Sequence, residues 1–593
     1  MFNLIKSLKI ILSRDDFKTL ISMSLTLTLV AFIEVGGLAG IAFLVLNLEN
    51  LDAVLLEIEF VNYFLSLAGF QDKNILFLFS GLIILYSIFT IIISSISIRR
   101  TSIFSELMGA KIKTSLLKYF LHLEWLEFSK SQSSVNMSRI IHDGDIVADM
   151  INFFMNLFNK FILAVIIIIG LFFFNASLTF GLALILSSAY LIIFSSFKNE
   201  TTKNSLQITK YMDTTLSMVT NIFGSFKEII FYNKQQKVMT NFEKIDSALA
   251  NLKGINMSYA YMPRFYIDSA LLLMLVAASI FVSFNGMSAS SFFATLSVYG
   301  IAGLKLLPAF QNIFYFSFEI FSRLPHLDNV TALLSQEISD DTSKANNPIV
   351  FNKKISFDSV SFAYKHTEKN SIEKLNLNIV KGRKIAVIGP TGSGKSTFID
   401  LLLGMLEPSL GQIRMDEDAL GKDNIQSYRK NFSFVPQKIF FLEDTLKQNI
   451  VFGSSEEPEM AKLQKAIVNS HLEELIDELP SGLETNISDS NQMVSGGQKQ
   501  CVGIARALYR GGEILILDEA TSGMDQGLEN KIYQTIFSSQ FQTFICVTHK
   551  PTLLHKFDEI VVFNNGCIEA VGSFEDLKTS NKFLQSMLSQ KIT

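Results

Sequence analysis

The C-terminal half of the chain contains the glycine-rich motif Gly389-Pro390-Thr391-Gly392-Ser393-Gly394-Lys395-Ser396-Thr397. Its glycines let successive backbone N–H groups converge on a phosphate, Lys395 adds a positive charge, and the Ser396 hydroxyl can bind Mg²⁺. The apolar run Ile385–Ile388 predicts a buried strand before the loop, and Ser396–Leu406 predicts a helix after it. Strand, glycine loop and helix N-terminus together form a phosphate-binding site. The nine residues are therefore the predicted contacts of a nucleotide.

A second motif, Val494-Ser495-Gly496-Gly497-Gln498, narrows the class of nucleotide-binding protein. It is followed by the apolar strand Ile514–Leu517 and by two acidic residues, Asp518 and Glu519. A phosphate loop alone leaves several classes open. In this order, however, the motifs resemble those of the ATP-binding-cassette (ABC) ATPases. The resemblance implies an α/β domain that binds ATP and Mg²⁺ and hydrolyses the ATP.

The resemblance also implies a role for individual residues around the nucleotide. Glu519 matches the general base, which accepts a proton from the attacking water. Ser396, Gln437 and Asp518 match the residues that reach Mg²⁺, and Gln437 also reaches the water. His549, after the predicted strand Phe544–Thr548, matches the histidine that bonds the γ-phosphate, and Asp525 matches the family's D-loop.

Two further matches concern the ends of the nucleotide. Tyr364 occupies the position at which family members stack an aromatic ring on adenine, although an ordinary edge-strand tyrosine is the alternative. Ser495, Gly496, Gly497 and Gln498 match a signature that, in the family, completes the site on a second ATPase. The chain has one phosphate loop and one signature. We therefore expect a half-transporter that works as a homodimer with two composite ATP sites.

The two halves of the chain differ in composition. The 593 residues are too many for a single core, and 49% of them are apolar while 18% are charged. The excess of apolar residues lies before residue 325, which predicts that this half is inserted in a membrane. The net charge of −4 gives no support for nucleic-acid binding. The predicted domains are a transmembrane domain over 1–325, a linker over 326–349 and the ATPase over 350–593.

Apolar runs of about 20 residues, the length that crosses a bilayer, predict the transmembrane topology. The six predicted spans are 19–46, 75–98, 152–174, 178–197, 266–284 and 290–318. The links 99–150 and 198–265 are rich in Lys and Arg, whereas the other links contain almost none. Basic links remain in the cytosol. We therefore expect a multi-pass protein of the bacterial inner (plasma) membrane with both termini and the ATPase in the cytosol.

These features resemble the ABC exporter fold, a multidomain membrane protein with a six-helix all-α transmembrane domain followed by a cytosolic α/β ABC ATPase. By this resemblance, Trp125–Ser131 and Gly224–Gln236 match the coupling helices that rest on the ATPases, with ordinary solvated loops as the alternative. The outer link 47–74 mixes apolar and acidic residues. It is predicted either to lie in the membrane interface as an amphipathic helix or to cap the first two spans.

The substrate is predicted from charged residues inside apolar spans, which cost about 2.5–3.5 kcal/mol each on insertion scales and tend to face a cavity. The candidates are Glu34, Lys160, Arg264 and Lys305. Arg264 and Lys305 resemble the cations of PglK-type flippases, which move lipid-linked oligosaccharides, although the second span lacks the basic residue expected there. The resemblance implies substrate contacts at Arg264, Lys305 and Glu34. In an alternative reading, Arg264 anchors the helix at the interface and Lys305 pairs with Glu34.

Two other functions are compatible with parts of the pattern. A drug or antimicrobial-peptide exporter would line an apolar pocket with the Phe-rich spans, and a non-transporting regulator or channel could use the same scaffold. Intact Glu519 and His549 argue against the regulator. Four positions depart from the family pattern without removing a catalytic atom: Val494, Cys501, the pair Gly523-Met524, and the glycine-poor turn Asn486–Gln492. We expect an active ATPase that flips a lipid-linked glycan, a polyprenyl-diphosphate oligosaccharide, to the outer leaflet.

Overall fold

The computed structural model describes residues 2–46, 75–269, 276, 280, 289–336, 349–364, 370–452, 457–489, 493–538, 541 and 543–589. The chain divides into two compact units, one of residues 1–123 and 127–338 and one of residues 124–126 and 339–593. The predicted outer segment 47–74 and most of the predicted span 266–284 lie outside the described residues. Each unit is described by itself below.

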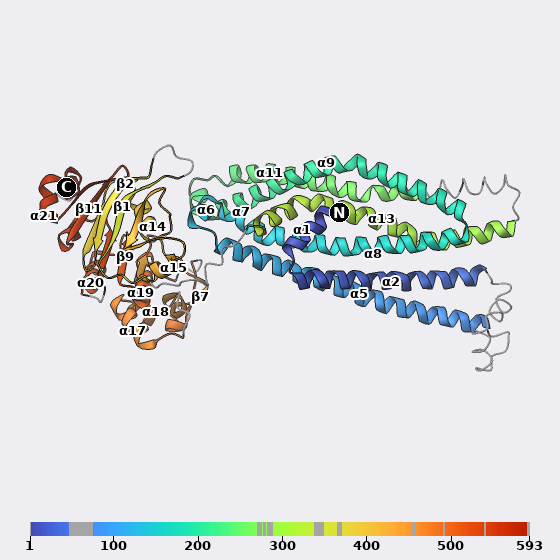
Figure 1. Cartoon of the computed structure of the whole chain (residues 1–593), viewed down its shortest axis with the longest axis horizontal. Helices are drawn as coiled ribbons and strands as arrows, with labels where there is room; N and C mark the ends of the chain where they lie inside the picture. The colour runs from blue at the N-terminus through green and yellow to red at the C-terminus, as the bar shows by residue number, and fades with distance from the viewer. Residues whose placement is uncertain are drawn as a thin grey trace. The chain divides into compact units, whose positions relative to one another are not determined.

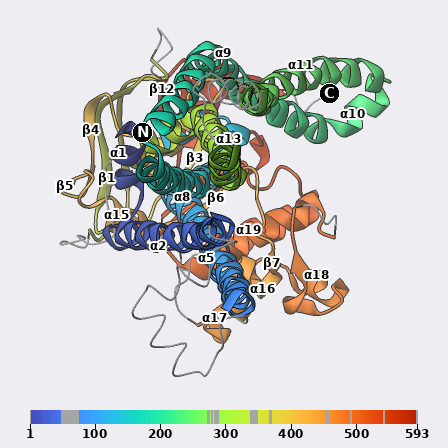
Figure 2. The ribbon, with the colours of Figure 1, turned by 90° about the vertical axis from the view of Figure 1, so that its right-hand side faces the viewer.

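The first unit consists of helices that run alongside one another (Figure 1) and are seen nearly end-on in Figure 2. Helix α13 packs against α8, α9 packs against α11, and α2 packs against both α5 and α8. The bounds of the helices are α1 Phe2–Ile11, α2 Arg14–Leu46, α5 Ile75–Leu121, α6 Trp125–Lys130, α7 Ser133–Ser138, the π-helical turn η2 Arg139–Asp143, α8 Gly144–Phe174, α9 Ala176–Gly224, α10 Phe226–Phe231, α11 Gln235–Tyr261 and α13 Ala289–Leu334.

Four helices among the described residues are long and apolar enough to cross a membrane. They are Arg14–Leu46, Phe77–Leu121, Ser133–Phe174 and Ala176–Gly224, and they cover the first four predicted spans apart from residues 75 and 76. Helices α5 and α9 have 47 and 49 residues. At about 1.5 Å per residue, such helices extend well beyond an apolar layer of about 30 Å. The last predicted span, 290–318, lies within α13, and the total of six spans stays a prediction.

Helix α13 continues past the predicted end of the transmembrane domain at residue 325. It contains Pro308 and Pro325 and ends at Leu334. Leu327 and Val330 are fully buried in a core that they share with α1, α5 and α8. Because apolar packing of these two side chains stabilises α13, the helix continues into the segment that was predicted as a linker.

The second unit is built on a six-stranded sheet with the order β12-β11-β3-β10-β9-β6. Its strands are β3 Lys384–Ile388, β6 Phe432–Val435, β9 Ile514–Asp518, β10 Thr543–Val547, β11 Glu559–Asn564 and β12 Cys567–Gly572. All neighbours are parallel except β11 and β12. Alternate side chains of β3 enter two different cores, Ala386 and Ile388 on one face and Ile385 and Val387 on the other.

A second sheet and a set of helices complete this unit. The sheet has the order β2-β1-β4-β5, with β1 Lys354–Phe362, β2 Ile372–Val380, β4 Leu410–Met415 and β5 Asp418–Ala419, and a two-stranded ladder joins β7 Asp444–Thr445 to β8 Asn486–Ile487. The helices are α14 Lys395–Leu402, α15 Ile425–Lys430, α16 Leu446–Ile450, α17 Met460–Asn469, α18 Glu473–Glu478, α19 Gly496–Arg510, α20 Gln526–Phe537, α21 Phe574–Ser580 and α22 Lys582–Ser589. The predicted α/β fold of the ATPase half is confirmed.

The helix that follows the phosphate loop is shorter than the predicted Ser396–Leu406. Helix α14 ends at Leu402, and Gly404 two residues later has φ +63°. A residue in the left-handed region stops the helical hydrogen-bond ladder, and glycine adopts it at little cost. The predicted helix end at Leu406 was therefore wrong by four residues.

Candidate ATP-hydrolysis site

The parallel register brings three strand ends to one edge of the sheet. Val547 on β10 lies opposite Val387 on β3 and opposite Asp518 on β9. The phosphate loop therefore begins beside the residues that follow Asp518 and Val547. This edge, at the carboxyl ends of the strands, is where open α/β sheets bind ligands.

The phosphate loop is held in a shape that only glycine permits at two points. Gly389 has φ +153°, and a Cβ atom there would lie 2.2 Å from the Phe563 carbonyl oxygen on β11. Gly394, with φ +104°, would bring a Cβ within 2.8 Å of the Ser371 carbonyl oxygen. At these two points the backbone of the loop packs directly against neighbouring backbone. A side chain there would push the loop out of the shape in which its N–H groups converge on a phosphate.

Lys395 is folded into this loop. Its ammonium donates to the carbonyl oxygens of Gly389 at 2.9 Å and Pro390 at 3.0 Å. Burial lowers the pKa of Lys395, while the charges of Glu519 and Asp518 oppose that effect. A partly desolvated cation facing two carboxylates is well placed to compensate phosphate charge.

One orphaned atom shows that the loop fits an anionic group. The buried Ser393 hydroxyl has no hydrogen-bond partner in the described part of the chain, and a phosphate oxygen would supply one. Ser396 follows at the start of α14. The described residues contain no cluster of three His, Cys, Asp or Glu side chains fit for a metal. The predicted Mg²⁺ set of Ser396, Gln437 and Asp518 instead combines a hydroxyl, an amide and one carboxylate, hard oxygen donors that suit this ion.

The structure brings three of the predicted catalytic side chains into contact. Glu519 accepts a hydrogen bond from Gln437 Nε2 at 2.7 Å on Oε2, and its Oε1 lies 3.0 Å from His549 Nε2. Glu519 has φ +49°, a conformation that costs a non-glycine residue about 1–3 kcal/mol and persists only where the surrounding structure holds it. The carboxylate is therefore fixed from two sides at the edge that carries the phosphate loop.

Asp518, next to this trio, is the predicted metal-binding carboxylate. Burial raises its pKa, the charge of Glu519 raises it further, and Lys395 opposes both effects. A divalent cation would offset the mutual repulsion of Asp518 and Glu519.

The signature residues form the N-terminus of α19. The Ser495 hydroxyl accepts from the Gln498 backbone N–H at 3.3 Å, and the Gln498 side chain accepts from the Ser495 backbone N–H at 2.8 Å. This reciprocal pair is a capping box, which fixes the first turn of the helix. Gly496 and Gly497 follow within that turn. The N-terminus of α19 is thereby ordered, as an anion-binding helix end requires.

Two other predicted residues have defined local positions. The hydroxyl of Tyr364 lies 3.5 Å from Thr397 Oγ1 of the phosphate loop, and its ring packs edge-on against Phe362. Asp525 caps α20 by accepting from the backbone N–H groups of Gly527 and Leu528. Tyr364 and Asp525 therefore have structural contacts of their own, and their roles at the nucleotide stay predictions.

The segment Glu124–Leu126 belongs to the ATPase unit. Glu124 forms an ion pair with Lys422 at 2.7 Å, and Leu126 packs against an ATPase core. Burial raises the pKa of Asp400 on α14 to about 6, the charge of Asp518 raises it too, and a hydrogen bond with Trp125 opposes them. Helix α6 begins at Trp125 and α10 lies inside the predicted second coupling segment.

The predicted substrate residues are paired with carboxylates. Lys305 Nζ lies 3.9 Å from Glu34 Oε2, and Ser94 donates to the other Glu34 oxygen at 3.0 Å. Arg264 Nε lies 3.8 Å from Asp268, which also accepts from Gln311. The structure therefore brings Lys305 and Glu34 together, as in the alternative reading, and gives Arg264 a different partner.

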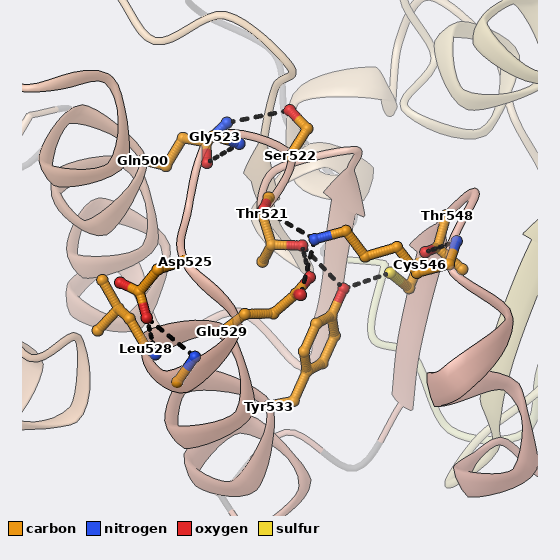
Figure 3. Close-up of polar contacts among 12 residues, drawn as sticks. Gln500, Thr521, Ser522, Gly523, Asp525, Leu528, Glu529, Tyr533, Cys546 and Thr548 are labelled. Carbon is orange, nitrogen blue, oxygen red and sulfur yellow. Dashed lines mark hydrogen bonds and ion pairs between the residues drawn. The ribbon is translucent and has the colours of Figure 1, made fainter. Parts of the chain in front are cut away.

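Sequence reasoning missed a polar network of the buried residues Glu529, Thr521 and Tyr533 (Figure 3). Lys550, which is partly exposed, joins it through an ion pair with Glu529. A signal was present in α20, where Glu529, Ile532, Tyr533 and Ile536 are all buried. These positions share one face of a helix. An acidic residue on an apolar face requires a partner.

Comparisons with known proteins agree with this geometry. Residues 372–522 match the ABC transporter family. An ATP-dependent lipid A-core flippase of Ralstonia nicotianae is 35% identical over 37% of the chain, and the match spans only 38% of that protein's length. The protein of the same description from Escherichia coli K12 is 26% identical over 80% of the chain and 82% of its own length. A bacterial Atm1-family ABC exporter solved with ATP bound has a TM-score of 0.81 at 19% identity, covering 98% of both chains.

The C-terminal unit is an ABC transporter ATPase, a domain that hydrolyses ATP. The fold of the whole chain is that of an ABC exporter, with an N-terminal helical unit ahead of the ATPase. Apolar helices long enough to span a bilayer lie in the N-terminal unit.

Proposed function

We propose that the chain is a half-transporter that uses ATP to flip a lipid-linked oligosaccharide, a polyprenyl-diphosphate glycan, from the cytosolic to the outer leaflet of the bacterial inner membrane. Both termini lie in the cytosol, and two copies form a homodimer with composite ATP sites. Two features support this function: the ATPase unit keeps its predicted catalytic residues, and the apolar helices carry Lys305, which pairs with Glu34 and is partly exposed.

In the ATPase, the phosphate loop and Lys395 bind the triphosphate. Ser396, Gln437 and Asp518 would hold Mg²⁺, which would neutralise charge that develops on the phosphates. Glu519 accepts the proton of the attacking water. Its contacts with Gln437 and His549 fix the carboxylate for this task. Ser495 and the N-terminus of α19 serve the site of the partner subunit.

The observation that carries the substrate class is the Lys305–Glu34 pair. The Lys305 side chain is 49% exposed, whereas Glu34 is 10% exposed. A cation held in place by a buried carboxylate, yet accessible on its other side, can bind the phosphate oxygens of a glycolipid head group. The names of the relatives, lipid A-core flippases, favour a lipid over a drug or peptide.

Lipid A-core flipping is the second candidate, because those relatives carry that name. The test uses the full-length protein in proteoliposomes with ATP. Flipping of a polyprenyl-diphosphate glycan is measured by its accessibility at the outer leaflet, with lipid A-core and a drug substrate in parallel vesicles. Transport of the polyprenyl-linked glycan supports the proposal, transport of lipid A-core alone supports the second candidate, and transport of the drug alone overturns both.

A further inference from the structure

A buried carboxylate contacts the two loops that carry the candidate hydrolytic residues. Glu529 on α20 is 7% exposed, and its Oε2 lies 2.6 Å from Lys550 Nζ. Its Oε1 accepts from the Thr521 hydroxyl at 2.7 Å (Figure 3). Both oxygens are thus used, and both partners come from loops at the ends of strands β9 and β10.

The two partners are close neighbours of the candidate catalytic side chains in the sequence. Thr521 lies two residues after Glu519, and Lys550 directly follows His549. Lys550 Nζ also lies 3.4 Å from the Thr521 carbonyl oxygen, and the Lys550 backbone N–H donates to Thr548 Oγ1 at 3.1 Å. One carboxylate therefore connects the loop that carries the base to the loop that carries the histidine.

The loop after β9 needs such a connection. Glu519 is in the left-handed region with φ +49°, and a strained residue persists only where its surroundings hold it. The described residues hold this loop at several points: the Glu519 backbone N–H donates to the Val547 carbonyl, the Glu519 side chain contacts Gln437 and His549, and Gln500 binds Ser522 and Gly523. None of these contacts joins Thr521 to Lys550, the residue that follows His549. Glu529 does so, because it binds both the Thr521 hydroxyl and the Lys550 ammonium, which also lies near the Thr521 carbonyl oxygen.

We propose that Glu529, through Lys550 and Thr521, is a positioning residue for ATP hydrolysis that holds Glu519 and His549 in register. The inference rests on the proposed ATPase function. Among the hydrogen bonds and ion pairs of the described residues, Glu529 binds none of the predicted nucleotide contacts, so its effect is on the rate of hydrolysis rather than on ATP binding. The Glu529 side chain is 7% exposed and the Lys550 side chain 37% exposed, so the pair is partly buried.

The test uses the full-length protein and the variant Glu529→Gln. Glutamine has nearly the same shape and still accepts from Thr521, but it provides no charge for Lys550. We expect kcat for ATP to fall by about ten- to a hundredfold, as for other small misplacements of catalytic groups, with KM within about twofold of the unmodified protein. Lys550→Met should behave like Glu529→Gln, and Lys550→Arg should recover most of the lost kcat because the charge is kept.

The matched control is Glu513→Gln. Glu513 pairs with Lys381 ahead of strands β9 and β3, at the sheet edge away from the phosphate loop. This variant should keep the unmodified kcat. A Glu529→Gln kcat within about twofold of the unmodified value, or equal impairment of Lys550→Arg and Lys550→Met, would overturn the inference. If Glu529→Gln does not fold, the Lys550 variants decide. Absence of ATP hydrolysis by the unmodified protein would instead refute the proposed function.

Discussion

The ammonium of Lys305 on α13 lies 3.9 Å from the carboxylate of Glu34 on α2, a residue 271 positions earlier in the chain. The pair makes the charge on each residue tolerable inside an apolar helix, because each neutralises the other. It also leaves nearly half of the Lys305 side chain exposed. Structural pairing and substrate binding are therefore compatible roles for the same lysine.

The first prediction concerns this pair. Lys305→Ala should reduce flipping of the polyprenyl-diphosphate glycan about tenfold or more, the size expected when a charge-assisted contact is lost. Basal ATPase activity should be retained. Lys305→Arg is the matched control, since it keeps the charge beside Glu34. The measurement is glycan accessibility at the outer leaflet of proteoliposomes, and unchanged flipping by Lys305→Ala would remove the phosphate-recognition argument.

A second prediction tests the candidate base. Glu519→Gln preserves an acceptor for Gln437 but cannot take a proton from water, so steady-state hydrolysis should fall by about 10²–10⁴-fold. ATP binding should remain, because the phosphate loop and Lys395 are unchanged. Phosphate release and equilibrium ATP binding are measured on the same preparation. Lys395→Ala is the complementary variant and should weaken ATP binding. Hydrolysis by Glu519→Gln at the unmodified rate would show that another residue is the base.

The composite sites can be tested by mixing two lesions. Chains carrying Lys395→Ala are combined with chains carrying Ser495→Arg, and heterodimers are purified through two different tags. In a heterodimer both lesions fall in one composite site, and the other site is intact. Nucleotide trapping should therefore occur in the heterodimer and fail in each mutant homodimer. Full ATPase activity of a monomer in detergent would contradict the homodimer.

The fourth prediction is a pH dependence of stability. Burial raises the pKa of Asp400 from 3.8 to about 6. The folded state therefore binds the proton more tightly than the unfolded state, and the destabilisation is fully present above pH 6 and is relieved as the pH falls towards 4. Asp400→Asn should raise the unfolding temperature at pH 7.5, and this gain should shrink at pH 5.

The control for this prediction has the opposite sign. Burial acts to raise the pKa of Asp416, but hydrogen bonds from the backbone N–H groups of Lys354, Asn352 and Lys353 outweigh it, so the pKa is lowered. Asp416→Asn should therefore destabilise the protein at neutral pH, with a smaller loss in acid. An Asp400→Asn gain that is equal at pH 5 and pH 7.5 would show that Asp400 does not titrate in this range.

The sequence predicted the parts of the site whose geometry is set locally. The strand, glycine loop and helix around Lys395 are contiguous, as are β9, Asp518 and Glu519, so short-range rules suffice for them. The end of α14 was misplaced because the prediction followed the apolar run to Leu406 and gave too little weight to Gly404, a residue that commonly ends a helix. The extension of α13 past residue 325 depends on burial of Leu327 and Val330 against other helices. Such tertiary packing is not visible in a single segment.

The polar network around Glu529, which sequence reasoning missed, joins residues that meet only in the folded sheet. Glu529 reaches Lys550, 21 positions away, because parallel strands place the ends of β9 and β10 side by side. The Lys305–Glu34 pair could be considered in advance only because charges are rare in apolar helices. The Arg264–Asp268 pair was also missed, although its i,i+4 spacing is one that a helix brings together.

The phosphate loop has a consequence for synthesis of the chain. Strand β3 lies between β11 and β10, both of which follow it by more than 150 residues, and Gly389 packs on the carbonyl of Phe563 in β11. The Gly566 backbone N–H also donates to Ser393. A ribosome-bound chain that has exposed the whole glycine motif still lacks β10 and β11, the strands that flank β3 in the folded sheet. We therefore expect the chain to bind nucleotide late in its synthesis, after strands β10 and β11 have emerged and flanked β3.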